Sequence, residues 1–356
     1  MSTGRNPALA ALPPPPRPGT PFEGLRLDAN EAPPLAHPAF RAALARGFDA
    51  LEPSRYPPSD AWGLREALAG WLSVSPSALV VGAGSDEVLS LLTEAWCAPA
   101  PGASRPVAVV PAPSFVMFRR RPLLRGWDVV EVPLQGDWEV DATALLEACD
   151  RHRPNLVFLA SPNNPTGRPV PPELVLAACA RTRHGLVVLD EAYAAYSRAG
   201  TPARPGPDNL VRVGTLSKVG LAALRVGWAE AAPHVVTALE AVRAPFSVAA
   251  ASQLAASAVL KEAGALLLEH VRGCAEERER LAHRLAALGT RVTPSEANFL
   301  WVRPRRDAES VHARLLERGV RVWRQPGPVT GGWLRVTVGT AGENLQLLEA
   351  WAAADG

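Results

Sequence analysis

Apolar and polar positions along this chain follow two successive patterns. Between Val80 and Ala229, short continuous apolar runs alternate with helix-like segments. The runs predict strands at 79–81, 107–110, 129–132, 156–159, 186–189, 211–213 and 226–228, and helices are predicted at 86–96 and 172–183. Apolar strands separated by helices are typical of a mostly parallel sheet covered on both faces. We therefore predict an α/β domain of three layers.

The second pattern begins after Pro245 and indicates a smaller α+β domain. It predicts long helices in 249–288, a strand at 299–302, a helix at 308–318 and strands near 320–323 and 334–338. Prolines crowd residues 1–21, which favours a flexible arm. The predicted organisation is an arm (1–24), a segment packing with the small domain (25–50), a large domain (51–245) and a small domain (246–356).

Composition excludes several classes of protein. The 356 residues carry a formal net charge of +2 without a basic stripe, which argues against nucleic-acid binding. We expect no membrane span, because no window of about 18 residues is uninterruptedly apolar. The start of the chain does not resemble a signal peptide. The four cysteines have no metal-ligand spacing, so we expect reduced thiols, no metal site and a cytoplasmic protein.

Lysine is rare in this chain: of its 37 lysines and arginines, only Lys218 and Lys261 are lysines. Arginine cannot lose its proton in proteins, whereas lysine can, so a retained lysine suggests chemistry. Lys218 follows a predicted strand, where a solvated surface lysine would be the ordinary interpretation. Thr215, Ser217 and Arg225 lie close to it in the sequence. Together these residues could supply a Schiff-base amine and a phosphate cup.

Two further segments place polar side chains after predicted strands. Asp190 directly follows the apolar run 186–189, and Tyr193 comes three residues later. The alternative interpretation of Asp190 is a helix cap or a residue of a surface turn. A buried carboxylate needs a cationic partner, and a protonated pyridine nitrogen would be one. The turn Ser161–Gly167 carries Asn164, whose amide could donate to a ring oxygen, although an ordinary loop would explain the turn alone.

Two more candidates concern anion binding. Gly84 and Ser85 belong to the segment Gly82–Glu87, which joins a predicted strand to a helix and could present backbone N–H groups to a phosphate. It is not a dinucleotide fingerprint, because Glu87 replaces the third glycine. Arg335 lies inside a predicted strand of the small domain, and a bidentate clamp on a substrate carboxylate would explain it.

In this order, the segments resemble the fold-type I aminotransferases of class I/II, and most closely their histidinol-phosphate aminotransferase branch. The resemblance runs from about residue 25 to the end of the chain. The matching segments are Leu27–Glu31, Arg55–Pro57, Gly82–Glu87, Pro113–Phe115, Ser161–Gly167, Asp190–Tyr193, Ser217–Lys218, Leu224–Gly227 and Ala297–Phe299. The whole set is highly specific for the superfamily and less so for the branch.

The resemblance implies that pyridoxal 5'-phosphate is the cofactor and that Lys218, Asp190 and Tyr193 act in catalysis. The cofactor contacts that it implies are Gly84, Ser85, Asp86, Phe115, Asn164, Asp190, Tyr193, Thr215, Ser217, Lys218 and Arg225. It also implies substrate binding by Arg335 and Asn30. Tyr56 resembles a residue that reaches the neighbouring subunit's cofactor, which implies a homodimer.

The sequence departs from the branch at Ala32 and in the small domain. Alignment on Pro326 and Gly327 puts Trp323 where the branch has an arginine that reaches the substrate's phosphate, and Arg324 follows it. Neighbouring strand residues point to opposite faces, so Arg324 inherits that role only if a bulge re-aims it. Both Trp323 and Arg324 are therefore candidate substrate-binding residues.

The predicted function is amino transfer from histidinol phosphate to 2-oxoglutarate in histidine biosynthesis. An aromatic amino acid donor is the first alternative. A threonine-phosphate decarboxylase-like lyase is another, because a fold does not fix a reaction. A cofactor-binding regulator would need a DNA-binding domain, and residues 1–25 are too short and too rich in proline to form one. The expected partners are small molecules, with no nucleic acid and no membrane.

Overall fold

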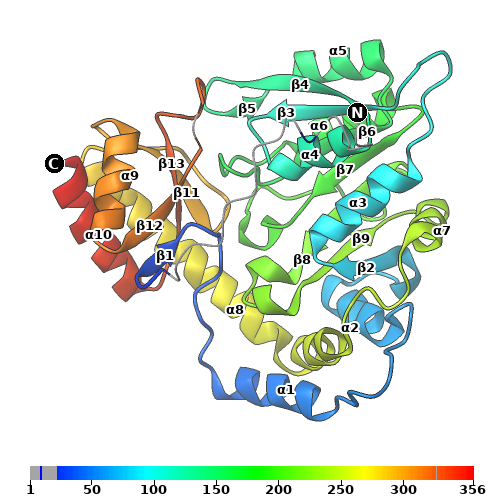
Figure 1. Ribbon diagram of the computed structural model, residues 1–356, viewed down its shortest axis with the longest axis horizontal. Coiled ribbons are helices and arrows are strands. Elements are labelled where there is room, and N and C mark those ends of the chain that lie inside the picture. The colour runs from blue at the N-terminus through cyan, green and yellow to red at the C-terminus, as the bar shows by residue number, and fades with distance from the viewer. Residues whose placement is uncertain (1–8, 10–21, 326) are drawn as a thin grey trace, which may run out of the picture.

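The computed structural model describes residue 9 and residues 22–325 and 327–356. These residues build two sheets with helices packed around them (Figure 1). The arm predicted for residues 1–24 lies almost entirely outside the described residues, as does Pro326. Within the described part of the chain, no helix is long and apolar enough to cross a membrane.

The larger sheet has eight strands in the order β2-β9-β8-β7-β6-β3-β4-β5. Their bounds are β2 Leu79–Ala83, β3 Val107–Ala112, β4 Asp128–Gln135, β5 Glu139–Val140, β6 Leu156–Ala160, β7 Leu186–Asp190, β8 Leu210–Thr215 and β9 Val226–Glu230. The pairs from β4 through β3, β6 and β7 to β8 are parallel, whereas β9 is antiparallel to both of its neighbours. The predicted strands and the mostly parallel sheet are confirmed.

Side chains alternate between the two faces of this sheet and bury both. Leu156 and Phe158 of β6 pack in one apolar cluster, and Val157 and Leu159 pack in another on the opposite face. The first face is covered by α3 (Ser85–Ala95), α4 (Val116–Leu124) and α7 (Pro233–Val242). The other face is covered by α5 (Ala142–His152) and α6 (Pro172–Arg181), with α1 (Pro38–Asp49), α2 (Trp62–Leu72) and α8 (Ala250–Ala287) toward β2 and β9. The three-layer prediction is therefore confirmed.

The smaller sheet has five strands in the order β1-β12-β13-β11-β10. Their bounds are β1 Leu25–Leu27, β10 Arg291–Val292, β11 Phe299–Arg303, β12 Val320–Arg324 and β13 Leu334–Thr337. One face carries Leu300, Val302, Val322 and Val336 into an apolar cluster with α9 (Ala308–Glu317), α10 (Ala341–Asp355) and α8. The other face carries aromatic residues and Arg335 toward the large sheet.

The segment 249–288, predicted to form several helices, is one continuous helix of 38 residues. Gly264 and Gly273 do not end α8, because it packs along its length against α1, α2 and the small sheet. The crossing with α1 is so close that a Cβ at Gly47 would lie 2.5 Å from the Cα of Ala255. Helix α8 therefore spans the molecule from one sheet to the other (Figure 1).

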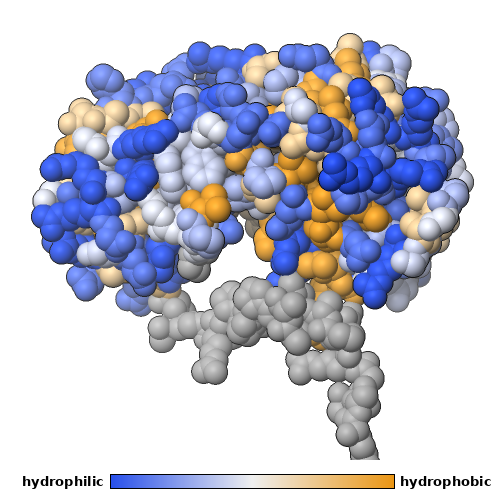
Figure 2. All heavy atoms as spheres, turned by 90° about the horizontal axis from the view of Figure 1, so that it is seen from above, coloured by the Kyte–Doolittle hydropathy of each residue, from blue (hydrophilic) through white to orange (hydrophobic). Residues whose placement is uncertain are grey.

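The outer surface differs between the two halves of the molecule. Seen from above, apolar surface gathers in a band over the half built on the large sheet (Figure 2). The half built on the small sheet is mostly hydrophilic in the same view. A contiguous apolar patch of this kind is typical of a surface that meets another molecule.

Candidate active site

A cavity of about 360 Å³ lies where β6, β7 and β8 end, between the start of α3 and the small sheet. The carboxyl edge of a parallel sheet is the usual place for a ligand. The predicted site residues that line this cavity are Asn30, Ser85, Asp86, Phe115, Asn164, Asp190, Tyr193, Thr215, Ser217, Lys218, Arg225, Trp323 and Arg335. Residues up to 307 positions apart in the sequence are thus brought to one place.

Asp190 is the last residue of β7, and its carboxylate is buried at the floor of the cavity. One oxygen accepts a hydrogen bond of 2.9 Å from the backbone N–H of Ala192. Burial raises the pKa of Asp190 from 3.8 to about 7; the Ala192 N–H and Lys218 oppose this, and Asp86 and Glu191 add to it. No ion pair to Asp190 occurs among the described residues. A ligand with a positive charge at this place would stabilise the ionised carboxylate.

Lys218 ends a short 3-10 turn that directly follows β8. Its Nζ lies 5.8 Å from the ring centroid of Tyr193 and donates to the carbonyl of Ala29 at 3.3 Å. The buried hydroxyl of Tyr196 donates to the Lys218 carbonyl at 2.5 Å. Tyr196 therefore fixes the backbone from which the lysine extends. It was not among the predicted site residues, although the chain has only three tyrosines and a buried hydroxyl usually has a partner.

The other end of the cavity presents hydrogen-bond donors. Arg225 donates to the hydroxyl of Ser217 at 3.1 Å, and Thr215 accepts from the Ser217 N–H at 3.1 Å. Gly84 precedes α3 with a φ of 82°, and a Cβ there would lie 2.5 Å from a guanidinium nitrogen of Arg225. Only glycine leaves room for this approach. A guanidinium, hydroxyls and a helix N-terminus form a site that suits a phosphate.

The small sheet supplies the opposite wall through Arg335 of β13. Its guanidinium donates to the side-chain oxygen of Asn164 and to the carbonyl of Asp28, both at 2.6 Å. It also lies over the ring of Trp323, 4.5 Å from the centroid. Burial lowers the pKa of Arg335, but a guanidinium remains protonated. Arg335 is thus held in place as a buried cation that faces the cavity.

Asn30 connects the two halves of the site. Its backbone has a φ of 52°, and its side-chain N–H₂ donates to the hydroxyl of Tyr193 at 2.9 Å. Its Oδ1 accepts from Thr337 of β13 at 3.2 Å. Asp28 and Gln325 also line the cavity and were not predicted to do so. Their places follow from the β1 and β12 backbones, which no local sequence signal reveals.

Three predicted residues do not line this cavity: Gly84, which lies behind the Arg225 guanidinium, Arg324 and Tyr56. Arg324 lies on the other side of β12, where its guanidinium contacts Glu309 of α9 at 3.1 Å. No bulge re-aims it, so Trp323 alone of the pair lines the site. Tyr56 is 82% exposed and stacks on Phe246, with 4.7 Å between the ring centroids. Within one chain, the cavity is formed without Tyr56.

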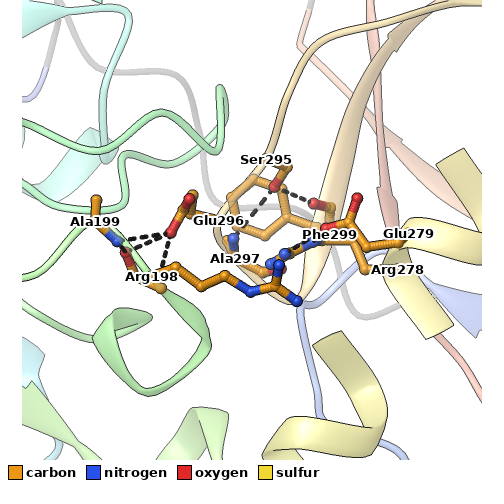
Figure 3. Close-up of polar contacts among 9 residues, drawn as sticks. Arg198, Ala199, Arg278, Glu279, Ser295, Glu296, Ala297 and Phe299 are labelled. Carbon is orange, nitrogen blue, oxygen red and sulfur yellow. Dashed lines mark hydrogen bonds and ion pairs between the residues drawn. The ribbon is translucent and has the colours of Figure 1, made fainter. Parts of the chain in front are cut away.

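The segment Ser295–Phe299 joins the two halves of the molecule by polar contacts (Figure 3). The carboxylate of Glu296 accepts from Ser197 Oγ at 2.7 Å and from the backbone N–H of Ala199 at 3.2 Å. The buried Arg278 of α8 donates to the carbonyl of Ala297 at 3.0 Å. Phe299 then meets the Tyr193 ring edge to face at 5.1 Å. These contacts hold in place Phe299, the residue against which the Tyr193 ring packs.

Comparison with known proteins gives a consistent result. The family model described as aminotransferase class I and II matches residues 23–350. A histidinol-phosphate aminotransferase of Chromobacterium violaceum is 38% identical, over 92% of this chain and 91% of that protein. One of Frankia casuarinae is also 38% identical, over 90% and 82%. The histidinol-phosphate aminotransferase of Sinorhizobium meliloti, solved with pyridoxal-5'-phosphate, superposes with a TM-score of 0.86, 25% identity and coverage of 99% and 98%.

Proposed function

The chain belongs to the class I and II aminotransferases, and we propose that it uses pyridoxal phosphate to move an amino group from histidinol phosphate to 2-oxoglutarate. The observation that carries the proposal is the pairing of a buried Asp190, without an ion-pair partner among the described residues, with Lys218 in one cavity. Curated relatives at 37–38% identity that carry the name histidinol-phosphate aminotransferase support the donor.

The residues of the cavity fit this cofactor. Asp190 lacks the cation that a protonated pyridine nitrogen would supply. At the other end, the guanidinium of Arg225 and the hydroxyls of Ser217 and Thr215 form a cradle of donors for phosphate oxygens. We propose that Ser85, Thr215, Ser217 and Arg225 hold the phosphate, that Phe115 packs on the ring, and that Asn164 and Tyr193 bond its phenolic oxygen.

Bound pyridoxal phosphate supplies an aldehyde that combines with amines and a ring that accepts the electrons released at the donor's Cα. The Asp190 carboxylate holds the proton on the ring nitrogen, because the low dielectric of its site strengthens that interaction. With the cofactor bound, the Lys218 amine would hold its aldehyde carbon, and an incoming donor amine would release Lys218 from it. The freed amine would take the proton from the donor's Cα and deliver it to the cofactor's former aldehyde carbon, which lies beyond the donor's nitrogen.

Arg335 orients each substrate through an anionic group. Its planar guanidinium suits a bidentate interaction with a carboxylate or a phosphate. Its hydrogen bond to Asn164 Oδ1 and its contact with Trp323 restrict its rotation before substrate arrives. We propose that the 2-oxo acid carboxylate and the donor's anionic group bind here in turn, with Asn30 holding Tyr193 at the reacting centre.

Trp323 favours a second candidate, an aromatic amino acid donor. The cationic residues among the described lining of the cavity are Lys218, Arg225 and Arg335. The proposed cofactor occupies the first two, which leaves Arg335 for the substrate. Trp323 stands beside it, and a flat ring packed there would gain about 1 kcal/mol beyond area burial. Phenylalanine or tyrosine would thus place its carboxylate on Arg335 and its ring on Trp323.

Donor kinetics distinguish the candidates. Purified protein loaded with cofactor is given histidinol phosphate, phenylalanine or tyrosine, with 2-oxoglutarate as acceptor, and kcat/KM is measured for each. Histidinol phosphate as the best donor supports the proposed function. A preference of about tenfold or more for the aromatic amino acids contradicts the donor but leaves the aminotransferase intact. Release of carbon dioxide without glutamate would instead identify a lyase, and binding without turnover would indicate a regulator.

We further propose a cytoplasmic homodimer in which Tyr56 reaches the partner's cofactor phosphate. The supporting observation is the exposed stacked pair of Tyr56 and Phe246, which does not line the cavity of its own chain. The apolar band on the large half (Figure 2) also suits contact with another copy. We also propose that residues 51–245 and 246–356 act as two domains, with 25–50 packing on the second.

A further inference from the structure

Four of the ten tryptophans gather where the large and small sheets meet. Trp301 of β11 stacks on Trp333 at 5.7 Å and lies 6.4 Å from Trp323 of β12. Trp138, from the turn between β4 and β5 of the large sheet, meets Trp301 at 5.9 Å and Trp333 at 5.3 Å, both edge to face. This tryptophan cluster therefore joins the large sheet to the substrate wall of the cavity.

The cluster is continuous with the substrate-binding arginine. Trp301 and Trp323 are the direct cross-strand neighbours of Arg335 on its two sides. All three share one face of the small sheet, because opposed residues in antiparallel strands point the same way. Trp301 is fully buried and the Arg335 guanidinium lies over Trp323, so a shift of this packing moves Arg335 as well.

The turn that carries Trp138 is also tied to the other side of the cavity. Glu139 forms an ion pair with Arg168, which directly follows the turn Ser161–Gly167. That turn carries Asn164, whose oxygen accepts the 2.6 Å hydrogen bond from Arg335. The β4–β5 hairpin thus contacts both elements that the Arg335–Asn164 hydrogen bond brings together, through Trp138 of its turn and Glu139 of β5.

Trp138 occupies a backbone position that does not suit its side chain. Its φ is 68°, in the left-handed region where hairpin turns usually have glycine or asparagine. Such positions persist when the surrounding structure over-determines them, and an observed outlier is a reason to look for a role. At Trp138, the contacts of the ring with Trp301 and Trp333 hold this backbone conformation and point to the role.

We propose that Trp138 is a positioning residue for Arg335: it sets the affinity of the site for the anionic group of each substrate without touching substrate or cofactor. Trp138 does not line the cavity, so its influence passes through Trp301 and Trp323. The inference rests on the proposed function in assigning Arg335 to substrate binding. Because donor and acceptor share Arg335, Trp138 affects both substrates.

The test uses Trp138→Gly, which suits the backbone of the turn and removes the whole side chain, and Trp138→Phe, which keeps a ring. We expect Trp138→Gly to raise KM about tenfold for both donor and acceptor, with kcat and the Kd of the cofactor changed less than twofold. Trp138→Phe should recover most of this loss. Asp137→Asn removes the 2.8 Å ion pair with Arg291 from the same turn, and since both side chains are 60% exposed it should change KM less than twofold.

A second readout does not depend on turnover. The Kd of 3-phenylpropionate, a carboxylate without an amine, is measured by calorimetry on wild type, Trp138→Gly, Trp138→Leu and Arg335→Ala. We expect the Kd to rise about tenfold in both Trp138 variants and binding to be lost without Arg335. An unchanged Kd in folded Trp138 variants, or a lowered thermal stability and cofactor affinity with unchanged KM, overturns the inference. A protein that binds the carboxylate through Arg335 but transfers no amino group contradicts only the proposed function.

Discussion

Replacement of Asp190 by asparagine should make the cofactor-free protein more stable and the enzyme nearly inactive. Burial raises the pKa of Asp190 from 3.8 to about 7, so the folded state binds this proton more tightly than the unfolded state. Stability from this group is fully present below pH 4 and is lost as the pH rises to about 7. At pH 8 the carboxylate is ionised in both states, and this difference in pKa corresponds to a cost of about 4 kcal/mol to the folded state.

The expected gain in stability is smaller than this cost. The buried amide of the asparagine would leave hydrogen-bonding groups without partners, which destabilises the folded state by about 2 kcal/mol. The net stabilisation of Asp190→Asn is thus about 2 kcal/mol at pH 8. With an unfolding entropy of about 2.1 cal/mol/K per residue, 356 residues convert this into a Tm rise of about 3 °C. At pH 5 most of the cost has not yet developed, so the gain should vanish.

The assay is scanning calorimetry of cofactor-free wild type and Asp190→Asn at pH 5 and pH 8. Glu191→Gln is the matched control. Burial raises the pKa of this neighbouring carboxylate too, although Arg212 at 2.7 Å and Arg204 at 3.2 Å oppose the rise. Its neutralisation leaves the buried Arg212 without a counter-charge, so Tm at pH 8 should fall. With cofactor, we expect Asp190→Asn to lower kcat by about 100-fold or more, as loss of a preorganised charge does. A variant that is no more stable at pH 8, or that keeps full activity, would refute the reasoning.

Two further predictions follow from the site. Arg335→Ala removes charge-assisted hydrogen bonds worth about 1.5–3 kcal/mol each, so kcat/KM should fall about 100-fold or more for donor and acceptor, measured by steady-state kinetics; a loss under tenfold would exclude the assigned role. Mixed dimers of Tyr56→Phe and Lys218→Ala chains should regain one site less impaired than either parent, because a symmetric dimer pairs the intact residues once. An active monomer in light scattering would contradict that prediction.

The large sheet could be predicted from the sequence because each of its central strands is a continuous apolar run in the local sequence. Strands such as β6 are buried on both faces, so they appear as apolar runs whatever surrounds them. Helix α4 was missed for the opposite reason: it contains Pro122 and three consecutive arginines, and Phe118 and Pro122 are its only buried residues. The continuity of α8 depends on tertiary packing that periodicity does not contain.

The residues of the candidate site likewise include some that could be predicted from the local sequence and others that depend on tertiary packing. Asp190 and Lys218 lie at or just after the carboxyl ends of the parallel strands β7 and β8, where ligands usually bind, so their convergence could be predicted from the sequence. Arg225 instead precedes β9, which reaches the same edge of the sheet because it is antiparallel to β8. Either Trp323 or Arg324 could face the cavity, depending on whether β12 contains a bulge. It contains none at this place, and Arg324 points away from the cavity to Glu309. Tyr196, Gln325 and Trp138 owe their places to the packing of segments that are distant in the sequence, and no residue spacing predicts them.

The most direct test of the account is to locate the cofactor on the chain. Purified protein is incubated with pyridoxal phosphate, reduced with borohydride, digested and analysed by peptide mass mapping. The chain offers only two side-chain amines, Lys218 and Lys261, and Lys218 alone of the pair lines the cavity. We predict a modified peptide containing Lys218 and none in Lys218→Ala, which should also lack turnover. Modification at Lys261, or no modified peptide, would contradict the account.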